Sequence, residues 1–240
     1  MRNLKIYRLP LAILLAFSVI FSAVSCTQGS GARNAVITDA FNTVSVIYDY
    51  SGASEESFDR TSGELFELLR YYHKLFDIYN TYDGMNNLAT VNSMAGKGAV
   101  EVAPEIIDFL EYSVQMHELT DGYVNIAMGA VLSIWHEHRT EGINNPIAAT
   151  LPSEEELIAA ADHCDIKNLI IDRENMTVEL VDPEMSLDVG AIAKGYATER
   201  LADYLEERGI SSYALDIGGN LRVIGTKPDG EGWKTGIKNP

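Results

Sequence analysis

The chain has 240 residues, of which 46% are hydrophobic and 22% are charged, so it can bury a core and does not have the composition of a disordered segment. Its 35 acidic and 18 basic residues give a formal net charge of −17 at pH 7, and a surface this acidic excludes general binding of nucleic acids. An anionic ligand must therefore be held locally, by a helix N-terminus, a few basic side chains or a metal ion.

The first 25 residues differ from the rest of the chain. Three bases and no acid precede an uncharged apolar run, Leu9 to Ser25, a layout that is typical of a secretory signal. The small residues before Cys26 make it resemble a bacterial lipoprotein signal, in which that cysteine is lipidated. We therefore expect a signal peptide over 1–25, a polar tether over 26–34, and a chain anchored by lipid to the bacterial cell membrane, outside the cytoplasm. The alternative is an uncleaved membrane anchor, because the run is close to the minimum spanning length.

Hydrophobic spacing predicts the elements of the next stretch of the chain. Pro104 is expected to open a helix, because its missing N–H costs nothing at the first helical position. Ser153 and Glu156 form a capping box that marks the start of another helix. The predictions are a strand pair or long strand within 35–50, helices over 54–79, 104–121, 126–138 and 153–161, and a polar loop over 140–152.

The pattern becomes rich in strands after residue 165. A turn at Glu174-Asn175 separates two runs of β-forming residues and predicts a hairpin. The predictions here are strands at 168–173, 176–181, 186–189, 213–217, 221–225 and 233–237, with a helix over 192–208. Cys164, next to His163 in an apolar-rich helix, is expected to be a core residue. The sum is an α+β domain over 35–240, with a mixed, largely antiparallel sheet covered by helices.

The strongest local signal for chemistry runs from Leu187 to Tyr196. Asp188 ends a predicted strand, Gly190 allows a sharp turn, and Lys194 lies in the first turns of the next helix. Backbone N–H groups at a helix start attract phosphate, the lysine adds a positive charge, and the carboxylate offers oxygen to a ligand hydroxyl or to Mg²⁺. A structural turn with an exposed lysine explains the same residues equally well, so from the residues alone both interpretations stand.

Three other motifs are weaker. Gly218-Gly219-Asn220 joins two predicted strands and would let a ligand approach the main chain, but a hairpin needs no ligand. The segment 120–125 is, on its own, best explained as the end of a helix. His136 and His138 flank Glu137, and this alternate spacing does not place both rings on one helical face, which disfavours a transition-metal site.

Taken together and in order, these motifs resemble the ApbE family, the FAD:protein FMN transferases. The resemblance extends from about Asp39 to Pro240. It rests on six segments: Phe76–Tyr79, Met85–Asn92, Thr120–Asn125, Asp188–Tyr196, Gly218–Asn220 and Trp233–Pro240. Asp188–Tyr196 matches its family motif almost letter for letter. In two of the other motifs, Asn86, Ala89 and Asn125 stand where the family usually has different residues.

The resemblance implies that the protein uses Mg²⁺ to transfer the FMN half of FAD to a Thr or Ser hydroxyl of a partner protein, with release of AMP. The partner is expected to be an extracytoplasmic flavoprotein, such as a membrane electron-transfer subunit. The carbonyl of Ala191 would ligate the metal. The residues expected to contact FAD are Phe41, Tyr79, Tyr123, Val124, Asn125, Asp188 and Lys194.

The resemblance also implies roughly a hundred further residues beyond Pro240, a length that fits one domain. That stretch would carry the catalytic base and most of the metal ligands, so we expect the 240-residue chain to be inactive as it stands. Three alternatives stay open: a lipoprotein that binds FAD without transferring it, an enzyme that hydrolyses FAD to FMN and AMP, and a solute-binding or structural lipoprotein.

Overall fold

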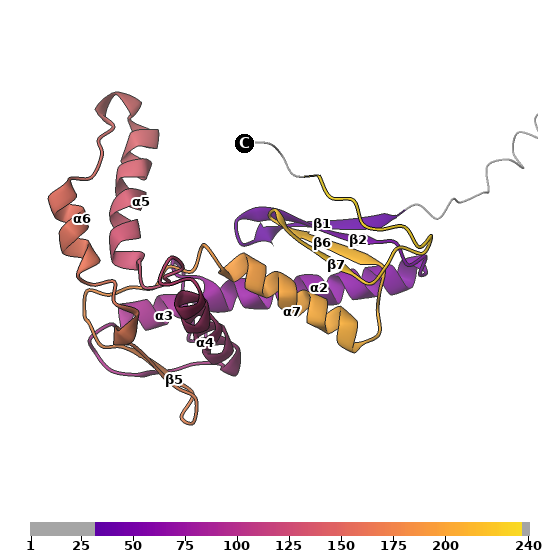
Figure 1. Cartoon of the computed structure of the whole chain (residues 1–240), viewed down its shortest axis with the longest axis horizontal. Coiled ribbons are helices and arrows are strands. Elements are labelled where there is room, and N and C mark those ends of the chain that lie inside the picture. The colour runs from indigo at the N-terminus through magenta and orange to yellow at the C-terminus, as the bar shows by residue number, and fades with distance from the viewer. Residues whose placement is uncertain (1–31, 237–240) are drawn as a thin grey trace, which may run out of the picture.

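A computed structural model of the chain describes residues 32–236. The predicted signal peptide and Cys26 lie outside the described residues. Figure 1 shows two regions joined by the long helix α2 (Glu55–Phe76), each containing its own sheet. Between residues 32 and 236, no helix is both long and apolar enough to cross a membrane.

The first region is a four-stranded antiparallel sheet. Its strands, in spatial order, are β1 (Arg33–Ala40), β2 (Thr43–Asp49), β6 (Tyr213–Ile217) and β7 (Asn220–Ile224). Helices α2 and α7 (Ala193–Glu207) cover one face of this sheet (Figure 1). β1 and β2 confirm the predicted strand pair, which begins two residues earlier than expected. Their turn has positive φ at both Phe41 and Asn42, the geometry that matches the twist of a tight hairpin.

The second region contains a small antiparallel sheet and several helices. The sheet has the order β3 (Val100–Glu101), β5 (Thr177–Leu180) and β4 (Leu169–Asp172). The helices are α3 (Leu88–Ser93), α4 (Pro104–Leu119), α5 (Gly129–Asn144), α6 (Glu154–Ala161) and the short 3-10 helices η1 (Pro146–Ala148) and η2 (Ile166–Asn168). The predicted α+β class with antiparallel pairing is confirmed, with two sheets in place of one.

One buried apolar cluster connects the two regions. At its centre, the ring of Phe76 stacks on Phe109 with 4.1 Å between centroids, and Phe109 meets the edge of Tyr196 at 5.1 Å. These rings come from α2, α4 and α7, so the packing of three helices holds the regions together. Aromatic pairs of this kind add about 0.5–1.5 kcal/mol each beyond their buried area.

Local capping signals gave accurate helix starts. Pro104 is the first residue of α4, and the Ser153 side chain accepts a hydrogen bond from Glu156 N (3.2 Å) while Glu156 Oε2 accepts from Ser153 N (2.9 Å). Helix α7 lies within one residue of the prediction at each end. The hairpin at Glu174-Asn175 is also confirmed.

The predicted bounds of two helices were wrong. Helix α2 ends at Phe76 instead of Tyr79, because the Asp77 carboxylate accepts hydrogen bonds from the N–H groups of Tyr79 (2.8 Å) and Asn80 (3.1 Å) and turns the chain. Helix α5 starts at Gly129 and continues to Asn144, into the stretch predicted as a polar loop. Helix α3 and strand β3 were not predicted.

Two predicted strands were also wrong. In the segment 186–189, Leu187 pairs with the side-chain amide of Asn92, which accepts from Leu187 N (2.8 Å) and donates to Leu187 O (3.0 Å), so no neighbouring strand is needed. Residues 233–236 form no strand, and Trp233 is attached by its indole N–H, which donates to Gly225 O (2.8 Å). Cys164 is buried as expected, but in a turn after α6 rather than in the helix.

Candidate functional site

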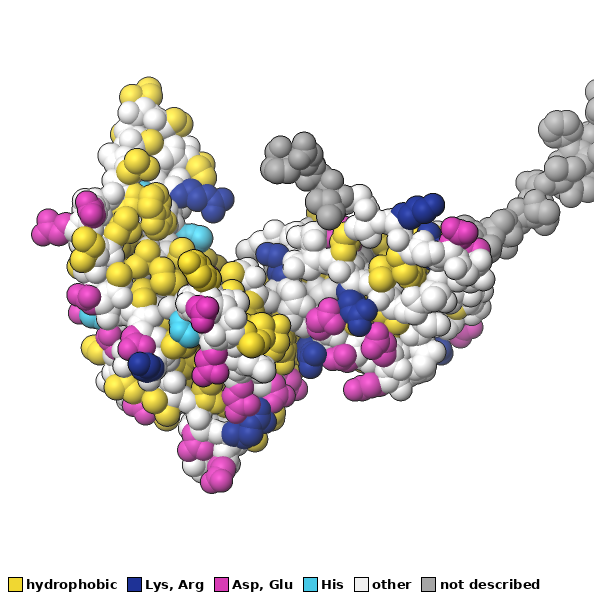
Figure 2. Space-filling view, viewed as in Figure 1, with side chains coloured by type: hydrophobic (Ala, Val, Ile, Leu, Met, Phe, Trp, Pro, Cys, Tyr) yellow, Lys and Arg dark blue, Asp and Glu magenta, His cyan; other side chains and the backbone are white. Residues whose placement is uncertain are grey.

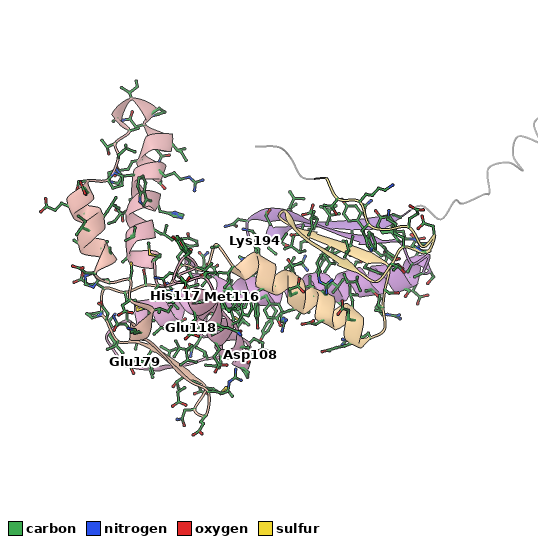
Figure 3. The ribbon with its side chains drawn as sticks, in the orientation of Figure 1. Asp108, Met116, His117, Glu118, Glu179 and Lys194 are labelled. Carbon is green, nitrogen blue, oxygen red and sulfur yellow. The ribbon has the colours of Figure 1, made fainter. Side chains whose placement is uncertain are left out.

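The segment that carries Asp188 and Lys194 forms a tight turn at the start of α7. The Asp188 carboxylate accepts a hydrogen bond from Gly190 N (2.9 Å), and Val189 O accepts from the N–H groups of Ile192 and Ala193. Figure 3 places Lys194 at the end of α7 that faces the second region. The predicted arrangement of carboxylate, glycine turn and helix start is therefore present, without the predicted strand before it.

A cavity of about 190 Å³ lies against this turn. Four of the residues expected to contact the ligand line it: Phe41, Tyr79, Asp188 and Lys194. They come from the β1–β2 turn, the loop after α2 and the start of α7, which are far apart in the sequence. The structure thus brings together over half of the expected contacts at one place.

The cavity combines an aromatic wall with polar groups. Phe76 lines it, and Phe41 packs edge-on against His73 with 5.5 Å between ring centroids. Sequence reasoning did not single out Asn42, His73 or Asn80, which also line the cavity. Asn42 and Asn80 each follow a residue that was expected to contact the ligand, Phe41 and Tyr79, and this adjacency was the only sign in the sequence that they line the cavity. His73 gave none, because it occupies an ordinary position on α2.

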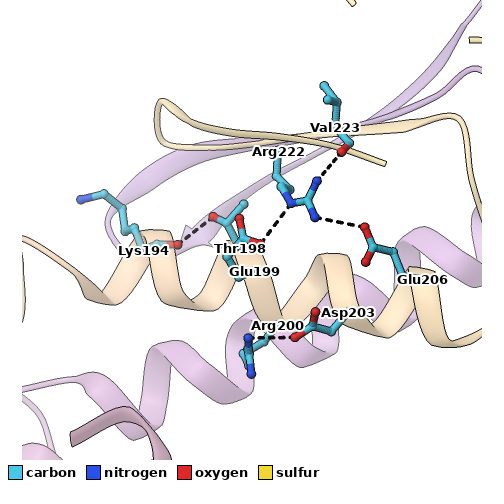
Figure 4. A network of polar contacts seen from close by, with 8 residues as sticks. All are labelled: Lys194, Thr198, Glu199, Arg200, Asp203, Glu206, Arg222 and Val223. Carbon is cyan, nitrogen blue, oxygen red and sulfur yellow. Dashed lines mark hydrogen bonds and ion pairs between the residues drawn. The ribbon is translucent and has the colours of Figure 1, made fainter. Parts of the chain in front are cut away.

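Within residues 32–236, the ammonium of Lys194 forms no salt bridge, although the Asp188 carboxylate lines the same cavity. The carbonyl of Lys194 accepts a hydrogen bond from Thr198 Oγ1 (2.7 Å). Figure 4 shows the ammonium pointing away from the neighbouring network, in which Arg222 binds Glu199 and Glu206. In a chain this acidic, an unpaired lysine beside a helix start favours an anionic ligand.

Tyr79 connects the cavity to helix α5. Its side chain is 66% exposed, and its hydroxyl lies 3.1 Å from His136 Nε2. Partial burial, together with the carboxylates of Asp188 and Asp77, raises the pKa of the Tyr79 phenol above its ordinary value. Tyr79 is therefore protonated at neutral pH and can donate or accept a hydrogen bond at the mouth of the cavity.

The other expected contacts lie elsewhere. Val124 and Ala191 line a separate hollow of about 870 Å³ beside α4 and α7, and Tyr123 is 94% exposed. The Asn125 side chain donates to Cys164 O (3.0 Å) and accepts from Ala127 N (2.9 Å), so it holds the turn after α4. The structure does not bring these four residues to the cavity that contains Asp188.

Metal ligands are sparse in the part of the chain that the structure describes. Within it, no three His, Cys, Asp or Glu side chains gather closely enough to hold a metal ion. His136 contacts Tyr79, whereas His138 Nδ1 lies 3.0 Å from Thr150 Oγ1, so the two imidazoles have different partners. Asp188 and Ala191, whose oxygens were the expected ligands at this turn, line different hollows.

Comparison with known proteins identifies the family. The profile of the ApbE family matches residues 68–240, which include the Asp188–Lys194 turn and most of the described chain. The chain belongs to the ApbE family. Phe41 precedes the matched range and reaches the site through the hairpin turn.

Individual ApbE relatives resemble the chain at low identity. A protein of Vibrio cholerae named FAD:protein FMN transferase is 27% identical over 177 residues, which cover 72% of this chain and 50% of that protein. A Treponema pallidum protein of the same name is 29% identical over 167 residues, covering 64% of this chain and 44% of that protein. The chain spans about half the length of these curated relatives.

Solved ApbE structures share the fold. The flavin transferase ApbE from Vibrio cholerae, as its H257G mutant, superposes with a TM-score of 0.70 at 24% identity and covers 87% of this chain and 68% of that one. The ApbE protein from Thermotoga maritima superposes with a TM-score of 0.68 at 25% identity, and the match covers 87% of this chain and 64% of that one. These matches support the observed arrangement of helices and antiparallel sheets.

Proposed function

We propose that this chain binds FAD at the cavity beside the start of α7, as part of an enzyme that transfers the FMN moiety of FAD to a protein. The observation on which the proposal rests is that Lys194, Asp188 and Tyr79 meet at one aromatic-walled cavity. The names of the relatives support flavin transfer.

Four residues of the cavity have proposed roles in binding the dinucleotide. Lys194 and those N–H groups in the first turn of α7 that have no backbone partner would neutralise and orient the diphosphate. The Asp188 carboxylate would accept a hydrogen bond from a ligand hydroxyl, and Phe41 and Tyr79 would shield an aromatic ring from water. These roles position the phosphorus without any covalent contribution from the chain.

The proposed transfer is a phosphoryl-group substitution. A bond forms between the hydroxyl oxygen of a Thr or Ser of the acceptor and the phosphorus of the FMN half. The bond from that phosphorus to the bridging oxygen breaks, AMP leaves with the electron pair, and the hydroxyl proton passes to a general base. Catalysis of this kind depends mainly on positioning and on stabilising charge at the phosphoryl oxygens.

Mg²⁺ would supply further stabilisation of that charge when bound. The described residues do not form a Mg²⁺ site on their own, because they offer no cluster of three ligands and because Ala191 and Asp188 line different hollows. The Mg²⁺ requirement therefore remains a proposal from the family resemblance, with the Ala191 carbonyl as one ligand.

The acceptor and the location are proposals of the same kind. We propose an extracytoplasmic flavoprotein acceptor, such as a membrane electron-transfer subunit, and a lipid anchor at Cys26. The support is the signal-like pattern of residues 1–25 followed by the small residues before that cysteine.

Incubation of the purified chain with FAD, a Thr-containing acceptor and Mg²⁺ tests the proposed function. Retention of intact FAD without transfer is the result expected of the 240-residue chain, which we expect to be inactive as it stands. Covalent flavin on the acceptor would show that this chain is a transferase by itself, and free FMN with AMP would indicate a hydrolase. A chain that does not bind FAD at all would contradict the assignment of the cavity.

A further inference from the structure

The helical hairpin formed by α5, η1 and α6 projects from the second region (Figure 1). Gly129, where α5 begins, is the only buried residue of α5, and α6 has none. The hairpin is therefore exposed over almost its whole length. Because the hairpin contributes little to the buried core, packing does not explain why it is there.

The end of the hairpin is apolar and carries no charge. Twelve consecutive residues, 142–153, contain no Asp, Glu, Lys, Arg or His, although the whole chain has a net charge of −17. Three aliphatic side chains stand out from this end: Ile143 is 67% exposed, Ile147 is 100% exposed and Leu151 is 80% exposed. Figure 2 shows hydrophobic side chains at the tip of the projection and along it.

The three aliphatic side chains do not hold the tip in shape. Polar contacts do so, because His138 Nδ1 lies 3.0 Å from Thr150 Oγ1 and Asn145 N donates to Glu141 O (2.7 Å). Close packing of Gly142 against Ala149 completes the bend. The exposed aliphatic groups are therefore not needed to hold the tip, and nothing within residues 32–236 covers them.

The sequence before β1 indicates what that contact is. The uncharged apolar run 9–25 ends only a few residues before Arg33, and the stretch from Cys26 to Arg33 reaches at most about 25 Å when fully extended. Whether residues 1–25 stay as an anchor or Cys26 carries a lipid, β1 then lies close to a bilayer. In Figure 1 the hairpin and the sheet that contains β1 lie at opposite ends of the molecule, and the tip of the hairpin extends past the level of that sheet.

We propose that the tip of this hairpin, residues 142–153, inserts its aliphatic side chains into the interfacial layer of the membrane that anchors the chain. The tip itself is uncharged and convex, and Glu141 and Glu154–Glu156 flank it, so its aliphatic side chains would enter a zwitterionic interface while the flanking carboxylates stay in water. Insertion would fix the orientation of the cavity relative to the membrane. The inference rests on the proposed membrane attachment and does not depend on FAD binding.

Tryptophan fluorescence in vesicles of phosphatidylcholine with brominated acyl chains tests the proposal. The full chain is reconstituted as the Ile147→Trp variant, and emission of the parent chain is subtracted to remove Trp135 and Trp233. Because bromine quenches only a nearby indole, we expect the added emission to fall about two-fold or more relative to vesicles without bromine. Adding Ile143→Asp should weaken that quenching, since a charge resists insertion.

Glu174→Trp provides the matched control, because Glu174 is also exposed at the turn of a hairpin, between β4 and β5. Its emission should be the same in both kinds of vesicle. Equal quenching at positions 147 and 174, no quenching at 147, or a chain that fails to float with the vesicles would each overturn the proposal. Unaltered FAD binding by every variant would show that flavin binding is a separate property.

Discussion

The carboxylate of Asp77 shapes one wall of the cavity. It accepts hydrogen bonds from the backbone N–H groups of Tyr79 (2.8 Å) and Asn80 (3.1 Å), from Asn80 Nδ2 (3.0 Å) and from the Tyr82 hydroxyl (2.8 Å). Burial works to raise the pKa of Asp77, but these four hydrogen bonds outweigh it and lower the pKa. Burial and the bond to Asp77 raise the pKa of Tyr82 to about 12. The charged carboxylate therefore holds Tyr79 in place.

Asp77→Asn should destabilise the protein at neutral pH by about 1–3 kcal/mol, because the amide loses charge-assisted acceptor capacity. The pKa of Asp77 in the folded protein lies below its unfolded value of about 3.9. The charged carboxylate therefore stabilises the fold fully above about pH 3.9, and this stabilisation is lost as the pH falls through the folded-state pKa. In urea unfolding, the gap between the two proteins should therefore narrow as the pH is lowered from 7 towards 3. Asp83→Asn, an exposed neighbour, should stay within about 0.5 kcal/mol of the parent. A gap that does not change with pH would contradict this account.

The sequence predicted residues of the cavity only where they belong to a recognisable motif. Asp188 and Lys194 stood in a distinctive stretch of sequence, and the structure places both at the cavity. His73 lines the same cavity, but only the packing of α2 against the β1–β2 turn brings it there, and a single sequence contains no sign of that packing. Asn125 illustrates the opposite case, because its family position suggested a ligand contact and its side chain instead binds Cys164 O.

At the level of elements, the sequence predicted best where a residue type that is typical of a helix end is present. Ser153 with Glu156, Pro104 and Gly209 each mark a helix boundary close to the observed one. The predictions failed where a side chain replaces a backbone partner over a long sequence distance. Asn92 pairs with Leu187 as a strand would, and hydrophobic spacing cannot reveal a pairing between residues so far apart in the chain.

Replacing Asn92 tests how this pairing supports the site. Asn92→Ala should cost about 1–3 kcal/mol, because it leaves the N–H and C=O of Leu187 without their partner. The loss should also weaken FAD binding, since Asp188 follows directly. Asn92→Asp keeps the acceptor for Leu187 N but sets a carboxylate oxygen against Leu187 O, so it should destabilise the protein to urea at least as much as Asn92→Ala does. Equal stability of Asn92→Ala and the parent would show that the segment is held by other contacts.

The whole molecule depends on contacts that no local pattern contains. Strand β2 pairs with β6 although the two are separated by most of the chain, and the rings of Phe76, Phe109 and Tyr196 meet only after three helices have packed. The sequence therefore indicated the fold class and the antiparallel pairing, but not the division into two sheets. The same long-range packing places the aromatic Phe41 opposite Lys194 and so creates the cavity.

The central claim is that Lys194 holds the diphosphate of FAD. Titration of Lys194→Met with FAD and with riboflavin, which has no phosphate, measures this directly. A hydrogen bond to a charged group contributes about 1.5–3 kcal/mol, so FAD affinity should fall roughly 10-fold or more while riboflavin affinity stays unchanged. Lys167→Met, at an exposed lysine outside the cavity, should bind both flavins as the parent does. Unchanged FAD affinity in Lys194→Met, or an equal loss for riboflavin, would contradict the account.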